Sequence, residues 1–444
     1  MNTIIYAVLL MGLLIFCAHL FNALFAKTKI PNVLLLLIIG IAAGFFVNQK
    51  QFFGELGRVF TTITLVVIIF ESGVNLKFSD LRKAIGPASM VTLFNFIASL
   101  IIVSTITHFF MNFDWTSAIF MGAVLGGTSS AVVIPMLKQM KMKEKSNNVL
   151  LLESALSDVL CLVVGLAALD GMKAGSLDVG SIFNSMWQSF VFAALIGIAA
   201  GFIWTLLLGF VRSAKNSMFT SLAYLFIVYA IVELLGWNGG IAALTLGIIL
   251  GNSGTFSESR VITKYLKIPV ATLRENELSF FSEIVFVLQT YFFVYVGISI
   301  QFSSFSTYLY GLLLVALIIL VRPLGIKLFA SKGVERKERR IMSVMTPKGL
   351  VAAVLASLPL QAGLSVGGII QDLGYAIVLL SIIICSILVM IAGSRPEVIF
   401  GVLGDRMHHH RSSGDEPATS ENPLLVDENM TEEENEPQMK SNEN

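Results

Sequence analysis

The sequence predicts an all-α protein that crosses a membrane about thirteen times, and three observations carry this prediction. The chain has 444 residues, of which 55% are hydrophobic and only 13% are charged, whereas soluble domains average about 25% charged residues. About thirteen stretches approach the roughly 20 apolar residues that a spanning helix needs. Two of these stretches are interrupted by polar residues at matching positions in the two halves of the chain. The near balance of 30 Lys and Arg against 29 Asp and Glu argues against a nucleic-acid partner.

The candidate spans follow one another along the chain with connecting loops that alternate in charge. They are centred on residues 3–25, 30–48, 59–77, 85–110, 115–138, 148–170, 185–211, 217–235, 238–252, 278–300, 306–330, 340–361 and 373–394. Loops after odd-numbered spans hold most of the Lys and Arg, and loops after even-numbered spans hold only Lys50, Arg58 and Lys173. Because cytoplasmic loops are rich in Lys and Arg, we expect a multi-pass protein of the plasma membrane with its N-terminus outside and its C-terminus cytoplasmic.

The chain divides into a membrane domain and a polar tail. Residues 1–395 contain all of the candidate spans, and residues 396–444 are acidic and rich in Pro, Ser and Asn. A segment of that composition buries too little apolar surface to fold. We therefore expect a transmembrane domain over residues 1–395, followed by an acidic, disordered cytoplasmic tail.

The membrane domain shows signs of an internal duplication. The second span contains LLIIGIAAGFFVN and the ninth contains LTLGIILGN, seven spans later. An odd offset places the two copies in opposite orientations, which predicts an inverted repeat over about residues 1–171 and 216–395. The pairs Gly40/Gly44 and Gly247/Gly251 within these spans are expected to let helix backbones approach closely.

Polar residues interrupt the fifth span at Gly126-Gly127-Thr128-Ser129-Ser130 and the twelfth at Thr346-Pro347-Lys348-Gly349. Hydroxyl side chains can bend a helix without opening it, so a simply kinked fifth helix is one interpretation. Two breaks at matching positions favour instead a pair of crossed, unwound helices that form a substrate site. Lys348 is placed to offset the partial negative charge of the carbonyl ends of such half-helices.

Ionisable side chains lie at membrane depth in three further spans. Carboxylates there are costly and mark functional sites. Arg322 lies at a depth similar to that of Glu153, and a buried Arg needs a carboxylate partner, so we expect a Glu153–Arg322 ion pair. This pairing leaves Asp158 free to bind a ligand. Glu71 is either a further carboxylate of the site or its access path, or a partner for Lys348 or a neighbouring serine.

Asp158 and the hydroxyls around it predict a site for a monovalent cation. A hard cation takes several oxygen ligands, which Asp158, Thr128, Ser154, Ser157 and the carbonyls freed near Thr128 can supply. Burial disfavours the charged form of a carboxylate, and a bound cation favours it. Asp158 is therefore expected to hold either a proton or a cation. If the protein changes between inward-open and outward-open states only when Asp158 is neutralised, cation/proton exchange follows.

The polar motifs taken together resemble one family of transporters. They are FESG at Phe70–Gly73, GGTSSAVVIPML at Gly126–Leu137, ESALSD at Glu153–Asp158, RP at Arg322-Pro323 and TPKGLVAAVLA at Thr346–Ala356. In order and spacing over about residues 1–395, they resemble the monovalent cation/proton antiporter superfamily, nearest to its sodium/proton exchanger (NhaP-type) branch.

The resemblance has implications for the fold, the assembly and the site. It implies an NhaA/NhaP-like antiporter fold and a homodimer in the lipid bilayer, with a mobile core bundle and a scaffold bundle at the dimer contact. It implies that Asp158 binds the ion and the proton, and that Thr128 and Ser154 are ligands. It also implies that Glu71 is a further site acid and that Glu153 pairs with Arg322.

Two positions depart from the pattern of that branch. Ser157 stands where the branch usually has Asn, and Thr128-Ser129-Ser130 stands where it usually has Thr-Asp-Pro. The serine pair is also similar to the potassium-efflux (Kef-type) branch, which bears on the choice of cation. We include Ser129 among the candidate ion- and proton-binding residues.

The sequence thus favours a secondary active transporter that exchanges a monovalent cation for protons, with a role in pH homeostasis. Sodium is the first candidate, and one cation per proton is expected by analogy. The alternative within the same fold is a potassium/proton antiporter or a channel-like potassium efflux protein. An organic-solute symporter and a membrane sensor are further alternatives. Because the sequence contains no nucleophile–base set, metal-ligand cluster or phosphate loop, we expect neither an enzyme nor a cofactor.

Overall fold

A computed structural model describes residues 12–21, 31–45, 55–79, 86–140, 142–174, 179–211, 217–257, 272–300, 304–330 and 334–394, together with Leu9 and Ala23. The polar tail and several of the basic loops lie outside these residues. The main helices are α2 (Asn32–Gly44), α4 (Glu55–Asn75), α6 (Pro87–Met111), α7 (Trp115–Val124), α8 (Ser130–Met140), α9 (Glu144–Ala174), α10 (Val179–Val211), α11 (Ser217–Leu234), α12 (Gly239–Gly251), α13 (Ser253–Ser257), α15 (Glu275–Ser299), α16 (Phe305–Phe329), α17 (Arg336–Val344), α18 (Leu350–Gln361) and α19 (Gly367–Ser394).

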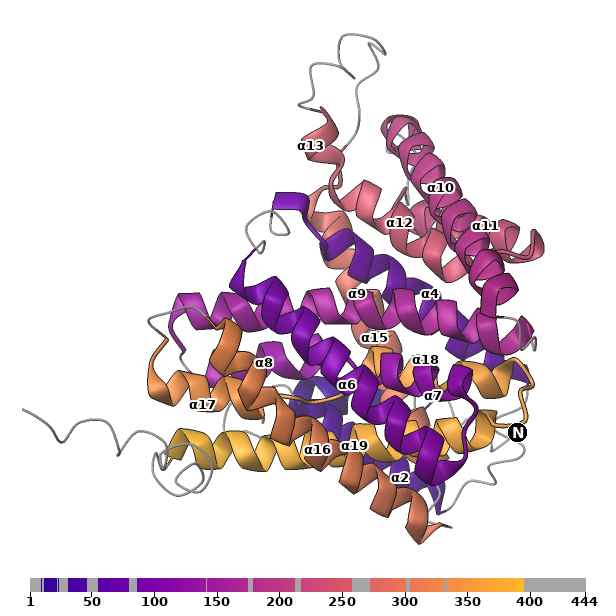
Figure 1. Cartoon of the computed structure of the whole chain (residues 1–444). Helices are drawn as coiled ribbons and strands as arrows, with labels where there is room; N and C mark the ends of the chain where they lie inside the picture. Colours follow the sequence, from indigo (N-terminus) through magenta and orange to yellow (C-terminus); the bar gives the residue numbers. More distant parts are fainter. Residues whose placement is uncertain are drawn as a thin grey trace, which may run out of the picture. The chain divides into compact units, whose positions relative to one another are not determined.

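The predicted all-α class is confirmed, since the described residues form helices and no strand (Figure 1). Within these residues, six helices are long and apolar enough to cross a membrane, and seven shorter apolar helices have 10–17 residues. The protein is therefore an integral, multi-pass membrane protein. The number of crossings stays a prediction, because the first span is described only over Gly12–Phe21 and several others are short.

Local sequence signals explain where several helices begin and end. α6 starts with Pro87, whose missing N–H costs nothing in the first turn. It ends at Asn112, which adopts a left-handed conformation with φ of 54°, a conformation that Asn tolerates better than most residues. The side chain of Asp114 then accepts a hydrogen bond from the Ser117 N–H at the start of α7, and Asn238 does the same for Ile241 at the start of α12.

Both predicted breaks are real interruptions of helices rather than bends. α7 ends at Val124 and α8 begins at Ser130, and α17 ends at Val344 and α18 begins at Leu350. The two unwound segments cross, and the Ser129 N–H donates a hydrogen bond to the Pro347 carbonyl at 2.8 Å. A Cβ at Gly349 would overlap the Ser129 side chain, so only glycine permits this approach.

Two helix pairs match the inverted repeat that the sequence predicts. α2 packs on α15, and α12 packs on α4, so the second helix of each repeat contacts the third helix of the other. Glycines face each other in both pairs: a Cβ on Gly40 would lie 2.8 Å from Cα of Gly297, and one on Gly73 would lie 3.2 Å from Cα of Gly247. The repeated glycines therefore set the close packing of these helices.

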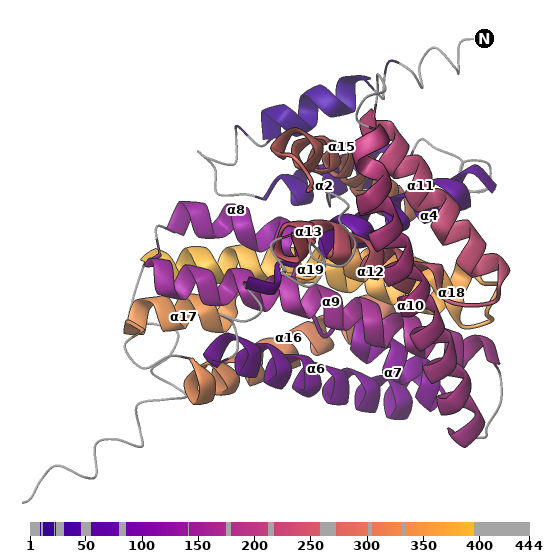
Figure 2. The same ribbon diagram turned by 90° about the horizontal axis from the view of Figure 1, so that it is seen from above.

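The helices gather into two groups that enclose the site. The core group contains α6, α7, α8, α9, α16, α17, α18 and α19, and the flanking group contains α2, α4, α10, α11, α12 and α15. Within the core group, the long α9 contacts α6, α7, α8 and α18 (Figure 2). This arrangement places the polar residues of α9 beside both breaks and close to α4 of the flanking group.

Candidate functional site

A cavity of about 410 Å³ lies between the two groups of helices. Residues of α4 and α15 form one wall, and residues of α8, α9 and α18, with Ser129 of the first break, form the other. The polar side chains that line it are Glu71, Ser72, Asn75, Ser129, Ser130, Asp158, Ser282 and Gln289. Because its two walls belong to different helix groups, a relative movement of the groups would change access to the cavity.

Asp158 projects from α9 into this cavity and is 8% exposed. The Ser130 hydroxyl donates a hydrogen bond to Asp158 Oδ2 at 2.8 Å, and the Ser130 backbone N–H is a second donor to this carboxylate. Since Ser130 is the first residue of α8, the carboxylate faces a helix N-terminus, where partial positive charge favours an anion. Within the described part of the chain, no Lys, Arg or His forms an ion pair with Asp158.

Glu71 lines the same cavity from α4, in the opposite wall. Its Oε1 accepts a hydrogen bond from Asn75 Nδ2, one helical turn away, at 2.7 Å. Lys348 is not its partner, because the Lys348 ammonium is bound elsewhere. The structure thus brings Glu71 and Asp158 to one cavity, and they are the two carboxylates among its described lining residues.

Thr128, Ser154 and Ser157 form a network that holds the first break against α9. The Thr128 N–H donates to Ser157 Oγ at 3.0 Å, and Ser154 Oγ donates to the Thr128 carbonyl at 3.1 Å. The Ser157 hydroxyl donates to the Ser154 carbonyl at 3.0 Å. None of the three is among the described residues that line the cavity. Their role as ligands stays a prediction, and in this structure their hydroxyls position the backbone around the site.

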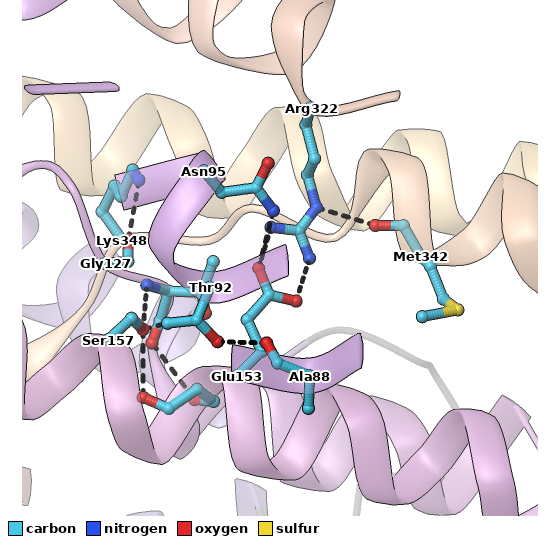
Figure 3. A network of polar contacts seen from close by, with 11 residues as sticks. Ala88, Thr92, Asn95, Gly127, Glu153, Ser157, Arg322, Met342 and Lys348 are labelled. Atoms are coloured by element: carbon cyan, nitrogen blue, oxygen red, sulfur yellow. Dashed lines mark hydrogen bonds and ion pairs between the residues drawn. The ribbon is translucent and has the colours of Figure 1, made fainter. Parts of the chain in front are cut away.

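Glu153 and Arg322 meet in the core group, as Figure 3 shows, and neither is among the described residues that line the cavity. Arg322 Nη1 and Nη2 donate to the two carboxylate oxygens of Glu153 at 2.6 and 2.9 Å. Arg322 Nε donates to the Met342 carbonyl at 2.7 Å, and Asn95 Nδ2 donates to Glu153 Oε1 at 3.0 Å. Glu153 is 1% exposed and Arg322 is 3% exposed. This network joins α6, α9, α16 and α17 through one buried charge pair.

Lys348 lies in the second break, and its side chain binds the backbone of the first break. Its Nζ donates a hydrogen bond to the Gly127 carbonyl at 2.7 Å, as Figure 3 shows, and its backbone N–H donates to Ser381 Oγ at 3.0 Å. Its side chain is buried, with 2% of the residue exposed. Unwinding leaves backbone carbonyls without helical partners, and the ammonium supplies a charged donor to one of them.

A second cavity of about 310 Å³ lies further along the same helices. It is lined by Leu166 of α9, whereas the first cavity is lined by Asp158. At 1.5 Å per residue, these two positions are about 12 Å apart along the helix axis. Beside this cavity, Asn238 Nδ2 of α12 donates a hydrogen bond to Asp170 Oδ2 of α9 at 3.1 Å, which joins the flanking and core groups.

Sequence reasoning missed Ser130 and Asn95, which contact Asp158 and Glu153. The sequence marks Ser130 as part of the first break but gives no sign that it donates to Asp158. Asn95 donates to Glu153, and its signal was a lone amide in an otherwise apolar stretch of the fourth span. In both cases the pattern marked a polar residue, but the pairing depends on how three helices pack.

The side-chain atoms that line the cavity determine what it can bind. Among the described residues there is no group of three or more His, Cys, Asp or Glu side chains that could hold a transition metal. The cavity instead presents carboxylate, hydroxyl and amide oxygens, which suit a hard cation. A carboxylate can also take up a proton, so the site has the chemistry for either occupant.

Comparison with known proteins places the chain in a family. A sequence model described as "Sodium/hydrogen exchanger, transmembrane" matches residues 12–393. The chain is 23% identical over 369 residues to the K(+)/H(+) antiporter NhaP2 of Shewanella sp. (strain MR-4), covering 81% of this chain and 61% of that protein. It is 27% identical over 272 residues to the Na(+)/H(+) antiporter ApNhaP of Aphanothece halophytica, covering 59% of this chain and 49% of that protein. The chain thus spans less than two thirds of the length of these curated relatives.

The fold also matches a solved structure. The sodium proton antiporter MjNhaP1 from Methanocaldococcus jannaschii superposes with a TM-score of 0.66 at 19% sequence identity, covering 88% of this chain and all of that chain. At this identity the similarity establishes the fold alone. The family model extends over almost all of the membrane domain, from the first span to the last. The chain therefore belongs to the sodium/hydrogen exchanger family of transmembrane proteins.

Proposed function

We propose that this protein is a secondary active transporter that exchanges a monovalent cation for protons across a membrane by alternating access. Asp158 is the residue that carries either the proton or the cation. Glu71 and the hydroxyls of Ser129 and Ser130 complete the cavity side of the site, and Thr128, Ser154 and Ser157 position the unwound backbone. Glu153 and Arg322 form a structural ion pair that takes no part in binding the transported ions.

One observation carries the proposal: Asp158 is a buried carboxylate that has no cationic partner among the described residues, in a cavity between two helix groups. An isolated buried charge is costly, so Asp158 favours neutralisation by whatever ligand the cavity admits. A proton and a small cation both neutralise one negative charge. They compete for the same oxygens, and this competition is the basis of exchange.

The positions of the two cavities support alternating access. The first reaches Asp158, and the second ends about 12 Å further along α9, at Leu166. Both lie along the boundary between the core and flanking groups. The loop charges assign the first cavity to the cytoplasmic side and the second to the outside. On this assignment the structure corresponds to an inward-open state, because the first cavity reaches Asp158 and the second stops short of it, while the Asn238–Asp170 hydrogen bond joins the two groups on the other side.

Sodium is the first candidate for the cation, and potassium is the alternative. The curated relatives include a K(+)/H(+) antiporter and a Na(+)/H(+) antiporter, so the measurement must compare both ions. A single exchanging carboxylate, with Glu153 held by Arg322, predicts one cation per proton and no net charge movement. We also propose that the protein is a homodimer in the plasma membrane, with its N-terminus outside.

The test is transport by the purified protein in liposomes with an imposed pH gradient and a pH-sensitive dye in the lumen. Sodium, lithium, potassium or choline chloride is added to wild type and to Asp158→Asn. We expect a small cation to collapse the gradient in wild type, with the same rate when the voltage is clamped at zero. Asp158→Asn should abolish the collapse while it leaves the yield of folded protein intact.

Asp372→Asn is the matched control, because this carboxylate on α19 lines neither of the two cavities. It should retain transport. Retention of cation-driven gradient collapse by Asp158→Asn would overturn the assigned role of this carboxylate. Potassium movement without proton movement would favour the channel-like alternative. No response of wild type to any cation over a broad pH range would refute the exchanger itself.

A further inference from the structure

We propose that Ser130 sets the balance between proton and cation at Asp158. Its hydroxyl donates a hydrogen bond to the carboxylate when the site is empty and turns to offer its oxygen when a cation is bound. Ser130 is thus a specificity-determining residue of the site. This inference rests on the proposed function, because it concerns how the same carboxylate chooses between its two occupants.

The geometry distinguishes Ser130 from its neighbour. Ser130 Oγ lies 2.8 Å from Asp158 Oδ2, and both residues line the cavity. Ser129 also lines the cavity, but its backbone N–H is bound to the Pro347 carbonyl and its side chain packs on Gly349 at the crossing. The hydroxyl of Ser130 therefore lies beside both the carboxylate and the open volume that a cation would enter.

The chemistry of a hydroxyl suits both states of the site. A hydroxyl has one donor and two acceptor lone pairs, and it rotates to suit its partner. The backbone N–H of Ser130 also faces Asp158, but an N–H can only donate and therefore opposes a cation. Of the two groups that Ser130 presents to the carboxylate, only the side chain can stabilise the empty anion and then become a ligand.

The other charged groups around Asp158 do not replace this role. Glu71 on α4 is the second titratable side chain among the described lining residues, and α8, α15 and α18 contribute none to the lining. Lys348 directs its ammonium to the Gly127 carbonyl. His19 stacks on Phe286 of α15, with ring centroids 5.0 Å apart. Among the described residues, Ser130 is therefore the side chain that hydrogen-bonds directly to Asp158.

The test compares Ser130→Ala with Ser130→Thr, which keeps the hydroxyl. Loss of the donor favours the protonated carboxylate, so Ser130→Ala should need a higher pH for half-maximal transport, by roughly one unit. Loss of an oxygen ligand and stronger competition from protons both raise the KM for sodium or potassium, by about tenfold at a fixed pH. The maximal rate should change less than KM. Ser130→Thr should return both values to within about threefold of wild type.

Ser386→Ala serves as a matched control, because its hydroxyl bonds to the Ile382 carbonyl of its own helix. It should show the wild-type pH profile and KM. A Ser130→Ala variant with wild-type KM and pH profile would overturn the inference and leave the proposed exchanger intact. Absence of transport in wild type refutes the exchanger instead.

If Ser130→Ala is folded but inactive, the inference is tested by measuring how much sodium, lithium or potassium chloride raises the thermal stability of each variant. Choline chloride is the reference salt. Cation-dependent stabilisation that is weakened in Ser130→Ala and restored in Ser130→Thr supports the inference. If Ser130→Ala is stabilised at the same salt concentrations and pH as wild type, the inference is overturned.

Discussion

The buried Glu153–Arg322 pair gives the sharpest prediction for stability. We consider Arg322→Met, Glu153→Leu and the double variant. Each single change leaves one charge at a site where Glu153 is 1% exposed and Arg322 is 3% exposed. The double change removes both charges and substitutes apolar side chains of similar length. The three variants together form a double-mutant cycle that isolates the interaction.

The contacts set the expected magnitudes. Arg322→Met removes two hydrogen bonds to Glu153 and one to the Met342 carbonyl. It leaves the carboxylate with Asn95 as its donor. Breaking a buried pair from one side costs about 3–5 kcal/mol, and the reciprocal change in Glu153 belongs to the same range. Replacing both partners is often neutral, although the Met342 carbonyl and Asn95 amide then each lose a partner, at about 1–3 kcal/mol.

We therefore expect the double variant to be at least as stable as the less stable single variant. The measurement is reversible unfolding in mixed micelles with increasing SDS, followed by tryptophan fluorescence and circular dichroism. The chain has four tryptophans that report on the fold. Glu335→Gln is the control: it removes an exposed partner of Lys143, and such surface pairs contribute about 0–1 kcal/mol.

Single variants that unfold within about 0.5 kcal/mol of wild type would refute the reasoning, because the pair would then be solvated in the folded protein. The reasoning would also be refuted if the losses in unfolding free energy of the two single variants simply added in the double variant, since this would show that Glu153 and Arg322 do not interact. A large coupling energy, together with a wild-type cation KM in a variant that remains folded, would separate this structural pair from Asp158, the carboxylate that we propose to bind the transported ions.

Three further changes probe the crossing, the helix packing and the start of α9. Lys348→Met removes the donor to a carbonyl of the first break and should lower the stability to SDS unfolding by about 1–3 kcal/mol; no change would mean that water replaces the ammonium. Gly73→Ala would press a Cβ into a backbone carbonyl of α12 and should cost about 1–3 kcal/mol or more, whereas Gly12→Ala, with no atom within 4 Å of its Cβ, should be neutral in the same assay. Glu338→Gln weakens the 2.7 Å bond from the Ser146 hydroxyl at the start of α9 and should speed amide hydrogen exchange in its first turn; unchanged exchange there would show that Glu338 is not needed to hold the helix end.

The sequence predicts much of the fold because a membrane leaves few alternatives. Backbone polar groups must be paired within hydrocarbon, so apolar stretches of this length become helices, as the six long spans do. The breaks were also visible, because Pro347 and Gly349 weaken a helix and the corresponding half-repeat carries its own glycines and hydroxyls. The same glycine spacing predicted close backbone packing, and Gly40 and Gly73 meet glycines of the other repeat.

The site was less predictable, because side-chain direction depends on how helices rotate against one another. Spacing placed Ser154 near Asp158, but it could not show that Ser154 turns to the Thr128 carbonyl while Asp158 turns to the cavity. Nor could it show that Ser130, across the break, supplies the donor. Helix ends have backbone groups to satisfy, and whichever polar side chain is near in three dimensions satisfies them.

The first break gives a physical reason why occupancy of Asp158 can be coupled to movement. Unwinding creates two helix ends whose backbone groups lack helical partners, a carbonyl end near Gly127 and an N–H end at Ser130. Lys348 offsets the first and Asp158 offsets the second, as expected for the partial charges of helix termini.

A ligand shifts a conformational equilibrium only through interactions that differ between the two states. When Asp158 takes a proton or a cation, the start of α8 loses its negative partner, whereas the carbonyl near Gly127 keeps its ammonium. The balance at the crossing then depends on the occupant. The core group carries both breaks, and Glu71 faces it from the flanking group. If Asp158 is the exchanging carboxylate, as we propose, we expect the empty, charged site to oppose movement of the core group past the flanking group, and either neutral form to favour that movement.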